Sequence, residues 1–202
     1  MFTGIIEETG EVVQLTKQHN LTLLTVHCNK ALENTHIGDS IAVNGVCLTA
    51  IALTNSDFTV ELQPETLRCT NLGDLQSGGA VNLERPMAPD GRFGGHMVQG
   101  HVDSTGIIRE FRQDGPAIEV TIETEPELTR YIAPKGFIAV DGISLTVVQT
   151  MPQKHMFTLT IITHTQNMVT LTHKSHGDRV NIEVDIVAKY VESLLTNYPK
   201  HT

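Results

Sequence analysis

The chain contains one nine-residue stretch twice, as Ile41-Ala-Val-Asn-Gly-Val-Cys-Leu-Thr49 and as Ile138-Ala-Val-Asp-Gly-Ile-Ser-Leu-Thr146. Six of the nine positions are identical, and the second copy begins 97 residues after the first. Each copy is a β-branched run, an Asn-Gly or Asp-Gly turn and a second apolar run, which predicts a β-hairpin. Cys47 in the first copy is replaced by Ser144 in the second, so the repeats are expected to carry different polar side chains at equivalent places.

The similarity continues on both sides of the hairpin, which indicates a duplication of about ninety residues. The matching segments are Gly4–Gly10 with Gly100–Gly106, Phe58–Leu62 with Phe157–Ile161, and Gly78–Glu84 with Gly177–Glu183. We therefore expect an amino-terminal domain at residues 1–90, a carboxy-terminal domain at 91–185, and a final unit at 186–202. The stretch Pro86–Gly95 is rich in Pro and Gly and is the expected linker.

The dominant period of the chain is two, which is typical of strands with one buried face. It is seen at Leu24–Cys28, Phe58–Leu62, Ile118–Ile122 and Val180–Ile186. Six short strands in each repeat predict a mainly β protein with two tandem six-stranded closed β-barrels of Greek-key type. Closure is favoured because it removes exposed strand edges. Short helices are expected at Asn29–Asn34, Pro64–Asn71 and Glu125–Ile132.

A carboxy-terminal helix of about three turns is expected after Asp185, with no counterpart after the first repeat. Its apolar residues recur at helical spacing, at Ile186, Val187, Tyr190, Val191, Leu194 and Leu195. This stripe needs a partner. It packs back on its own barrel or forms a contact between subunits, and the sequence pattern alone leaves both open.

The composition excludes several classes of protein. A net charge of -9 argues against nucleic-acid binding. No apolar run reaches the length of a membrane span, and the first ten residues do not resemble a targeting signal. The three cysteines have no disulfide or zinc spacing and are expected to be reduced in a cytoplasmic protein. His96 and His101 lie five residues apart, but without a cluster of further ligands no metal site and no cofactor is expected.

Taken singly, the polar candidates have ordinary explanations. A lone cysteine such as Cys47 is more often a small buried hydrophobe, and a serine after a turn is more often a backbone partner. The glycines of Gly91–Gly95 lack the strand–turn–helix context of a phosphate loop. His101 is a better candidate, because it replaces Ile5 of the first repeat and so makes the two halves unequal.

Together the motifs resemble the riboflavin synthase family of the trimeric α-chain type. The resemblance runs from Met1 to about Tyr190 and rests on Met1-Phe-Thr-Gly-Ile-Ile-Glu-Glu-Thr-Gly10, Val43-Asn-Gly-Val-Cys-Leu-Thr49, Gly94-Gly-His-Met-Val-Gln-Gly-His-Val102 and Val140-Asp-Gly-Ile-Ser-Leu-Thr-Val147, with Pro64-Glu-Thr-Leu67, Thr70-Asn-Leu-Gly-Asp-Leu75 and Val81-Asn-Leu-Glu-Arg85. It implies a dismutation of two 6,7-dimethyl-8-ribityllumazine molecules by transfer of a four-carbon unit. The products are riboflavin and 5-amino-6-ribitylamino-2,4-pyrimidinedione.

The resemblance also implies a homotrimer in which the amino-terminal barrel of one subunit faces the carboxy-terminal barrel of a neighbour. The two substrates would stack between these barrels. Two similar pockets suit two molecules of one substrate, and their differences suit the donor and acceptor roles. The resemblance also raises lumazine synthase as a further partner.

By this resemblance each barrel contributes one group of substrate-binding residues. The amino-terminal group is Gly4, Ile5, Ile6, Cys47, Leu48, Thr49, Glu61, Leu62, Gln63, Pro64, Glu65, Thr66, Gly100, His101 and Val102, with Phe2 and Thr3 closing over the ring. The carboxy-terminal group is Lys135, Ser144, Leu145, Thr146, Ile161, Ile162, Thr163, His164, Thr165 and Gln166. Thr49, Glu65 and Thr146 are expected partners of the ribityl hydroxyls.

The catalytic candidates are His101, Ser144, Cys47, Asp185 and Thr146. His101 is expected to transfer a proton. Ser144, assisted by Asp185, is expected to activate a nucleophile or water, and Cys47 to contact the amino-terminal substrate. Thr163 departs from the family, which has proline there, so a looser second loop is expected.

Two other readings belong to different classes of protein. A non-catalytic chromophore carrier, like the lumazine proteins of luminous bacteria, would have lost pocket residues, whereas Cys47, His101, Ser144, Thr146 and Asp185 are all present. The flavin-binding barrel of a reductase would need a nucleotide domain, for which the two repeats leave no room.

Overall fold

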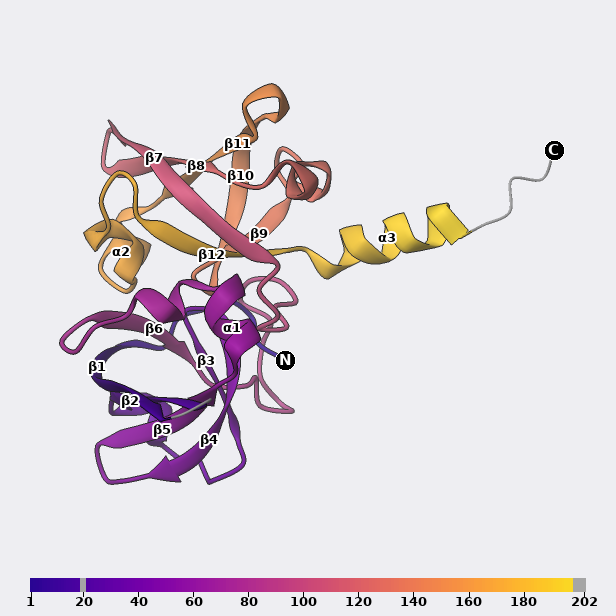
Figure 1. The fold of residues 1–202 in the computed structure, drawn as a ribbon. Helices are drawn as coiled ribbons and strands as arrows, with labels where there is room; N and C mark the ends of the chain where they lie inside the picture. Colours follow the sequence, from indigo (N-terminus) through magenta and orange to yellow (C-terminus); the bar gives the residue numbers. More distant parts are fainter. Residues whose placement is uncertain (19–20, 198–202) are drawn as a thin grey trace.

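The computed structural model of the chain describes residues 1–18 and 21–197 and contains two closed six-stranded antiparallel β-barrels, as predicted. The first barrel has the strand order β1-β2-β5-β4-β3-β6, and the second has β10-β11-β8-β7-β12-β9. Figure 1 shows the barrels one above the other, with the long helix α3 extending to one side. Among the described residues, no helix is long and apolar enough to cross a membrane.

The secondary structure of the two repeats corresponds, except that the second has one additional short helix, η4, between β10 and β11. The first barrel has β1 Glu8–Gln18, β2 Leu21–His27, η1 Lys30–Leu32, β3 Ser40–Val43, β4 Val46–Leu53, β5 Asp57–Leu62, α1 Pro64–Cys69, η2 Asn71–Asp74 and β6 Ala80–Glu84. The second has β7 Ser104–Asp114, β8 Ala117–Glu123, η3 Pro126–Tyr131, β9 Phe137–Val140, β10 Ile143–Met151, η4 Pro152–Lys154, β11 Met156–Ile161, α2 Thr163–Gln166, η5 Thr170–His173 and β12 Arg179–Val184. The helix α3, Ile186–Asn197, follows, so Ile186 begins a helix and does not continue β12.

The repeated stretch forms the two-residue hairpins β3–β4 and β9–β10. The φ angles are 45° at Asn44 and 77° at Gly45, and 46° at Asp141 and 79° at Gly142. Two consecutive residues with positive φ define the turn whose twist matches the strands, and Asn, Asp and Gly tolerate it best. The two turns touch, because a Cβ added at Gly45 would lie 2.6 Å from the Gly142 nitrogen. The hairpin tips therefore join the barrels.

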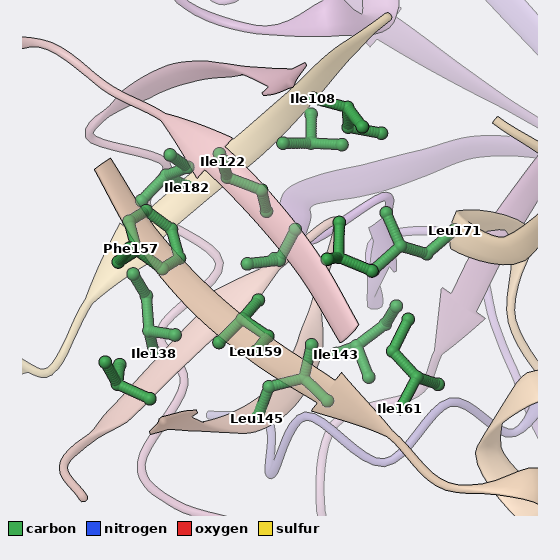
Figure 2. Packing of buried hydrophobic residues seen from close by; sticks show 14 of the residues in the cluster. Ile108, Ile122, Ile138, Ile143, Leu145, Phe157, Leu159, Ile161, Leu171 and Ile182 are labelled. Carbon is green, nitrogen blue, oxygen red and sulfur yellow. The ribbon is translucent and has the colours of Figure 1, made fainter. Parts of the chain in front are cut away.

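Each barrel has its own apolar core, formed by the inward-facing residues of its strands. Figure 2 shows side chains of the second core, including Ile108, Ile122, Phe157, Leu159 and Ile182, all at most 1% exposed. Register shifts in β1, β4, β7 and β10 mark equivalent bulges in the two repeats. Such bulges bend strands and help a sheet to close.

Two segments cross between the barrels, Thr3–Ile6 before β1 and Gln99–Val102 before β7. Ile6 packs in the core of the second barrel, and Val102 packs against the core of the first. We call these the crossing segments. Each belongs to one repeat by sequence and to the other barrel by packing, so the division at 1–90, 91–185 and 186–202 stays a prediction.

A polar network with one buried charge joins the hairpin tips. Asp141 is fully buried and accepts hydrogen bonds from Asn181 N and from Asn71 Nδ2 of the other barrel, each at 2.8 Å. Lys174 Nζ lies 3.4 Å from its second oxygen. Burial raises the pKa of Asp141, while Lys174 and the N–H donors act in the opposite direction. The first repeat has the neutral residues Asn44 and Leu75 at the corresponding positions.

We expect Lys174→Leu to lower the free energy of unfolding by about 3–5 kcal/mol, because it leaves a buried carboxylate without its counter-charge. A carboxyl whose pKa is higher in the folded than in the unfolded state stabilises the protein at low pH. That contribution is lost as the pH rises through the folded pKa. The variant should therefore become less stable as the pH rises above about 4, measured by urea unfolding at several pH values.

The double variant Asp141→Asn/Lys174→Leu copies the neutral pair of the first repeat and is the control. It should recover most of the lost stability and show little of the added pH dependence. An unchanged unfolding free energy for Lys174→Leu at pH 5 and at pH 8 would contradict the assignment.

Candidate functional site

Two buried glutamates fix the crossing segments. Glu84, at the end of β6, accepts hydrogen bonds from Thr3 N at 2.7 Å, Thr3 Oγ1 at 2.9 Å and Gly4 N at 3.0 Å. Glu183, at the end of β12, accepts from the backbone nitrogens of Gln99, Gly100 and His101 at 2.6, 2.9 and 3.0 Å. Burial raises the pKa of both carboxyl groups, and the N–H donors counteract it.

The crossing segments place one glycine against each of the two variable hairpin residues. Ser144 N donates to Gly4 O at 2.8 Å, and Cys47 N donates to Gly100 O at 2.9 Å. Gly4 and Gly100 have φ angles of 76° and 80°, and an added Cβ would lie 2.6 Å and 2.5 Å from the β-carbons of Ser144 and Cys47. Positive φ and close approach both require glycine here. The structure thus forms two equivalent surfaces, one around Cys47 and one around Ser144.

This arrangement corrects the expected grouping of Gly4, Ile5 and Ile6 with the amino-terminal pocket. Gly4 contacts Ser144, and Ile6 belongs to the core of the second barrel. The segment therefore lies at the Ser144 surface. Gly100, His101 and Val102 lie at the Cys47 surface, and their part in binding a substrate stays a prediction. Sequence pattern could not reveal the crossing, because the partners of each segment are far away in the chain.

Phe2 and Thr3, which are expected to close over a substrate ring, are both buried in this chain. Phe2 is fully buried between the barrels, paired with Val98 and packed with Ala42 and Ala139. Thr3 is 6% exposed, and its hydroxyl donates to Glu84. In this structure both residues hold the crossing segment, and their closing over a bound ring stays a prediction.

The Ser144 surface contains an imidazole that the sequence pattern did not assign to it. His96 Nδ1 lies 2.7 Å from Ser144 Oγ, and the His96 ring stacks on Phe137 with centroids 5.1 Å apart. His96 follows two glycines of the linker. A Cβ on Gly95 would lie 2.2 Å from Thr3 O and 2.7 Å from Ser144 Oγ, so only glycine lets the linker approach this closely. In the sequence, the Gly-Gly-His run was the signal that could have indicated a close approach of His96 to another segment.

His96 is 7% exposed, and burial lowers its pKa, whereas the charge of Asp185 acts to raise it. The imidazole is therefore neutral at neutral pH. Asp185 follows β12, and its carboxylate accepts from Val187 N at 2.9 Å at the start of α3. Ser144 is hydrogen-bonded to His96, and the charge of Asp185 acts on this imidazole, so the expected assistance of Ser144 by Asp185 stays a prediction. A hydroxyl, a neutral imidazole and a carboxylate in this order form a group able to remove a proton from the hydroxyl.

The Cys47 surface has a different chemistry. Cys47 is half-buried, and among the described residues its thiol has no hydrogen-bond partner. His101 is exposed on this surface, held through its backbone by Glu183. The corresponding residue at the Ser144 surface is the 48% exposed Ile5. The two surfaces share a backbone frame and differ in their titratable groups.

The remaining candidates divide into exposed and buried residues. Thr49, Gln63, Pro64, Glu65, Lys135, Thr146, Ile162, Thr163 and His164 are exposed, Glu61, Thr66, Thr165 and Gln166 are intermediate, and Leu48, Leu62, Leu145 and Ile161 are buried. Thr49 and Thr146 are available to a ligand. Glu65 is already paired with Arg68 and bonded to Cys69. The buried leucines and Ile161 support the surfaces from inside.

Thr163 does not leave the second loop unstructured. Thr163 Oγ1 and Gln166 Nε2 both donate to Pro116 O, at 3.2 Å and 3.0 Å, and the loop forms α2. Pro64 begins the corresponding α1. Two hydrogen bonds to the β7–β8 turn thus hold the segment that proline initiates in the first repeat.

One hollow of the chain, of about 760 Å³, is lined by Ile5, Glu7, Arg85 and Arg92 among others, but not by Cys47, His96 or Ser144. Neither the Cys47 side chain nor the His96–Ser144 pair therefore belongs to this hollow. Among the described residues, no group of three or more His, Cys, Asp or Glu side chains could hold a metal ion.

Comparisons with known proteins show the family to which both repeats belong. The lumazine binding domain family matches residues 3–86 and 99–185. A riboflavin synthase of Actinobacillus pleuropneumoniae is 48% identical over 199 residues, covering 98% of this chain and 92% of that protein. One of Bacillus subtilis is 45% identical, covering 96% and 90%.

Solved structures share the fold at lower identity. LumP complexed with riboflavin has a TM-score of 0.84 and 20% identity, covering 92% of this chain and 100% of that chain. LumP complexed with 6,7-dimethyl-8-(1'-D-ribityl) lumazine has a TM-score of 0.82 and 19% identity, covering 92% and 99%. With both repeats matched and nearly full-length relatives of one kind, this chain belongs to the riboflavin synthase family and is an enzyme.

Proposed function

We propose that the chain catalyses the dismutation of two 6,7-dimethyl-8-ribityllumazine molecules. One donates a four-carbon unit and becomes 5-amino-6-ribitylamino-2,4-pyrimidinedione, and the other accepts it and becomes riboflavin. The observation that carries the proposal is the pair of equivalent but unequal surfaces, with Ser144 bonded to His96 on one and Cys47 beside His101 on the other. A substrate that acts both as donor and as acceptor needs two surfaces with the same frame and different polar side chains.

The Ser144 surface supplies the base. Neutral His96 accepts the proton of the Ser144 hydroxyl across their 2.7 Å hydrogen bond, so that the oxygen, or a water bonded to it, adds to the acceptor ring. The nearby charge of Asp185 stabilises the imidazolium that forms. The proton is returned when the added nucleophile is eliminated. The hydroxyl of Thr146, exposed two residues further along β10, contacts the same ring system.

The Cys47 surface holds the other substrate. Its exposed His101 transfers the proton lost from the C7 methyl group, whose carbanion is delocalised by the substrate ring. The Cys47 thiol contacts the ring, and Thr49 binds the ribityl chain. The two products together contain the same atoms as the two substrates, so the reaction needs no external oxidant or reductant.

The complete site is proposed to form between subunits of a homotrimer. The exposed Thr49 and Thr146 lie at the two surfaces, and enclosing two rings between subunits would supply the orientation that a bimolecular reaction needs. The helix α3 projects from the second barrel (Figure 1) with its apolar stripe exposed, including Leu194 at 64% and Leu195 at 75%. A second copy of the chain would cover this stripe. A cytoplasmic location and association with lumazine synthase complete the proposal.

The direct test is to add 6,7-dimethyl-8-ribityllumazine to the purified protein with EDTA and to follow riboflavin absorbance. We expect one riboflavin per two lumazines over many turnovers. Tight binding with altered lumazine fluorescence but no riboflavin would overturn the proposal in favour of a chromophore carrier.

We expect Ser144→Ala and His96→Ala each to lower kcat by about 10²-fold, because general acid–base assistance has at least this size. The double variant should lose little more, since the two groups act as one unit. His176→Ala, an exposed histidine of the same barrel, is the control and should keep normal activity. Near-normal kcat in both single variants with intact folding would remove this pair from the mechanism.

We expect Leu194→Glu to dissociate the trimer into monomers and to lower activity, because it places a charge in the exposed carboxy-terminal part of the apolar stripe. Thr196→Glu changes an exposed polar residue of the same helix and should leave the oligomer intact. Sedimentation velocity measures both. If Leu194→Glu sediments like the unmodified protein, α3 does not form the subunit contact.

A further inference from the structure

Phe137 is a half-exposed aromatic residue that lies outside the residues discussed above as substrate contacts. It begins β9, where it pairs with Thr146 of β10, and its side chain is 46% exposed. Its ring stacks on the imidazole of His96 with an interplanar angle of 8°. The first repeat has Ser40 at this position, paired with Thr49 in the same way. The ring is therefore present only in the barrel that has the imidazole.

Two contacts hold the His96 side chain from different directions. The Ser144 hydroxyl bonds Nδ1, and the Phe137 ring covers one face of the imidazole. Ser144 and Phe137 come from adjacent paired strands, whereas His96 comes from the linker and is fixed at its backbone by Thr3 O at 3.1 Å. An imidazole held only by one hydrogen bond could turn about its side-chain bonds and move Nδ1 away from Ser144. The stacked ring restricts this turning and keeps Nδ1 directed at Ser144.

We propose that Phe137 is the positioning residue of the His96–Ser144 pair, keeping the imidazole oriented and shielded from water so that it accepts the serine proton. This inference deepens the proposed function and rests on it for its catalytic meaning. The stacking and shielding themselves can be measured without any substrate.

Three effects on His96 decide the direction of its titration. Removing water from the ring disfavours the imidazolium and lowers the pKa, and this burial is the main cause of the shift. The charge of Asp185, between β12 and α3, acts in the opposite direction. The electron-rich face of Phe137 also attracts a cation, but by only about 0.5–1 kcal/mol at a partly exposed site. Of the groups packed around His96 from the linker, β9 and β10, Ser144 contributes a neutral hydroxyl and Phe137 an uncharged ring. When the Phe137 ring is removed, the loss of shielding from water therefore changes the pKa of His96 more than the loss of the ring's attraction for a cation.

The experiment compares Phe137→Ser, which copies Ser40 of the first repeat, with Phe137→Leu, which keeps an apolar cover without a flat ring. Phe93→Ser is the matched control, because Phe93 is 53% exposed in the linker and stacks on no ring among the described residues. The titration of His96 is followed by NMR of the ¹⁵N-labelled full chain, in which its signal is identified by its loss in His96→Gln. The pH profile of kcat is measured in parallel.

In Phe137→Ser we expect the pKa of His96 to rise toward its ordinary value, and kcat to fall about tenfold with KM little changed. The direction in which the pH profile shifts follows because the neutral imidazole is the base. A higher pKa protonates His96 at a higher pH, so the acidic limb of the kcat profile moves to higher pH. Phe137→Leu should keep the titration of the unmodified protein and still lose part of kcat, because it shields without orienting.

An unchanged His96 titration and pH profile in Phe137→Ser would overturn the proposal, even if the protein makes riboflavin normally. Lack of riboflavin formation by the unmodified protein would instead overturn the proposed function. The NMR titration would still decide whether Phe137 shields His96. A rise equal to that in Phe93→Ser would also count against a specific role of Phe137.

Discussion

The arrangement of both surfaces depends on the exchange of the crossing segments Thr3–Ile6 and Gln99–Val102 between the barrels. Glu84 and Glu183 hold them through short hydrogen bonds to consecutive backbone N–H groups. A buried carboxylate with several N–H partners is stabilised by hydrogen bonding, whereas one with none would be expelled or protonated. Because each segment crosses, neither barrel can form its surface alone. The tandem barrels therefore act as one unit at the site.

Duplication supplies a symmetric frame, and point differences within it supply the chemistry. The paired turns, bulges, glutamates and glycines are preserved in both repeats, since they determine backbone geometry. Four differences that bear on the two surfaces lie in the hairpins and the crossing segments, where the barrels meet. They are Ser40 and Phe137, Asn44 and Asp141, Cys47 and Ser144, and Ile5 and His101, and a further difference, Leu75 and Lys174, accompanies the buried Asp141.

The residues that stabilise the fold and the polar groups of the candidate site lie in different parts of the molecule. The two apolar cores lie inside the barrels, and the polar groups of the site lie at the ends of β3, β4, β9 and β10 where the barrels touch. A rigid frame on one side lets the residues on the other vary with little cost to folding.

The sequence by itself determined the local structure. The Asn-Gly and Asp-Gly turns predict positive φ at Asn44 and Asp141, and alternating apolar residues predict strands that close into two barrels, because these signals depend on neighbours in the chain. Only the tertiary structure decided that Ile6 enters the opposite barrel, that Phe2 is buried, and that His96 lies between Ser144 and Phe137. His96 lies 41 residues before Phe137 and 48 before Ser144, and Phe2 lies 137 residues before Ala139, while the place of Ile6 depends on which barrel its segment reaches. Long-range packing leaves no periodic signal in the sequence, and for this reason the backbone frame was predictable while the partners within the site were not.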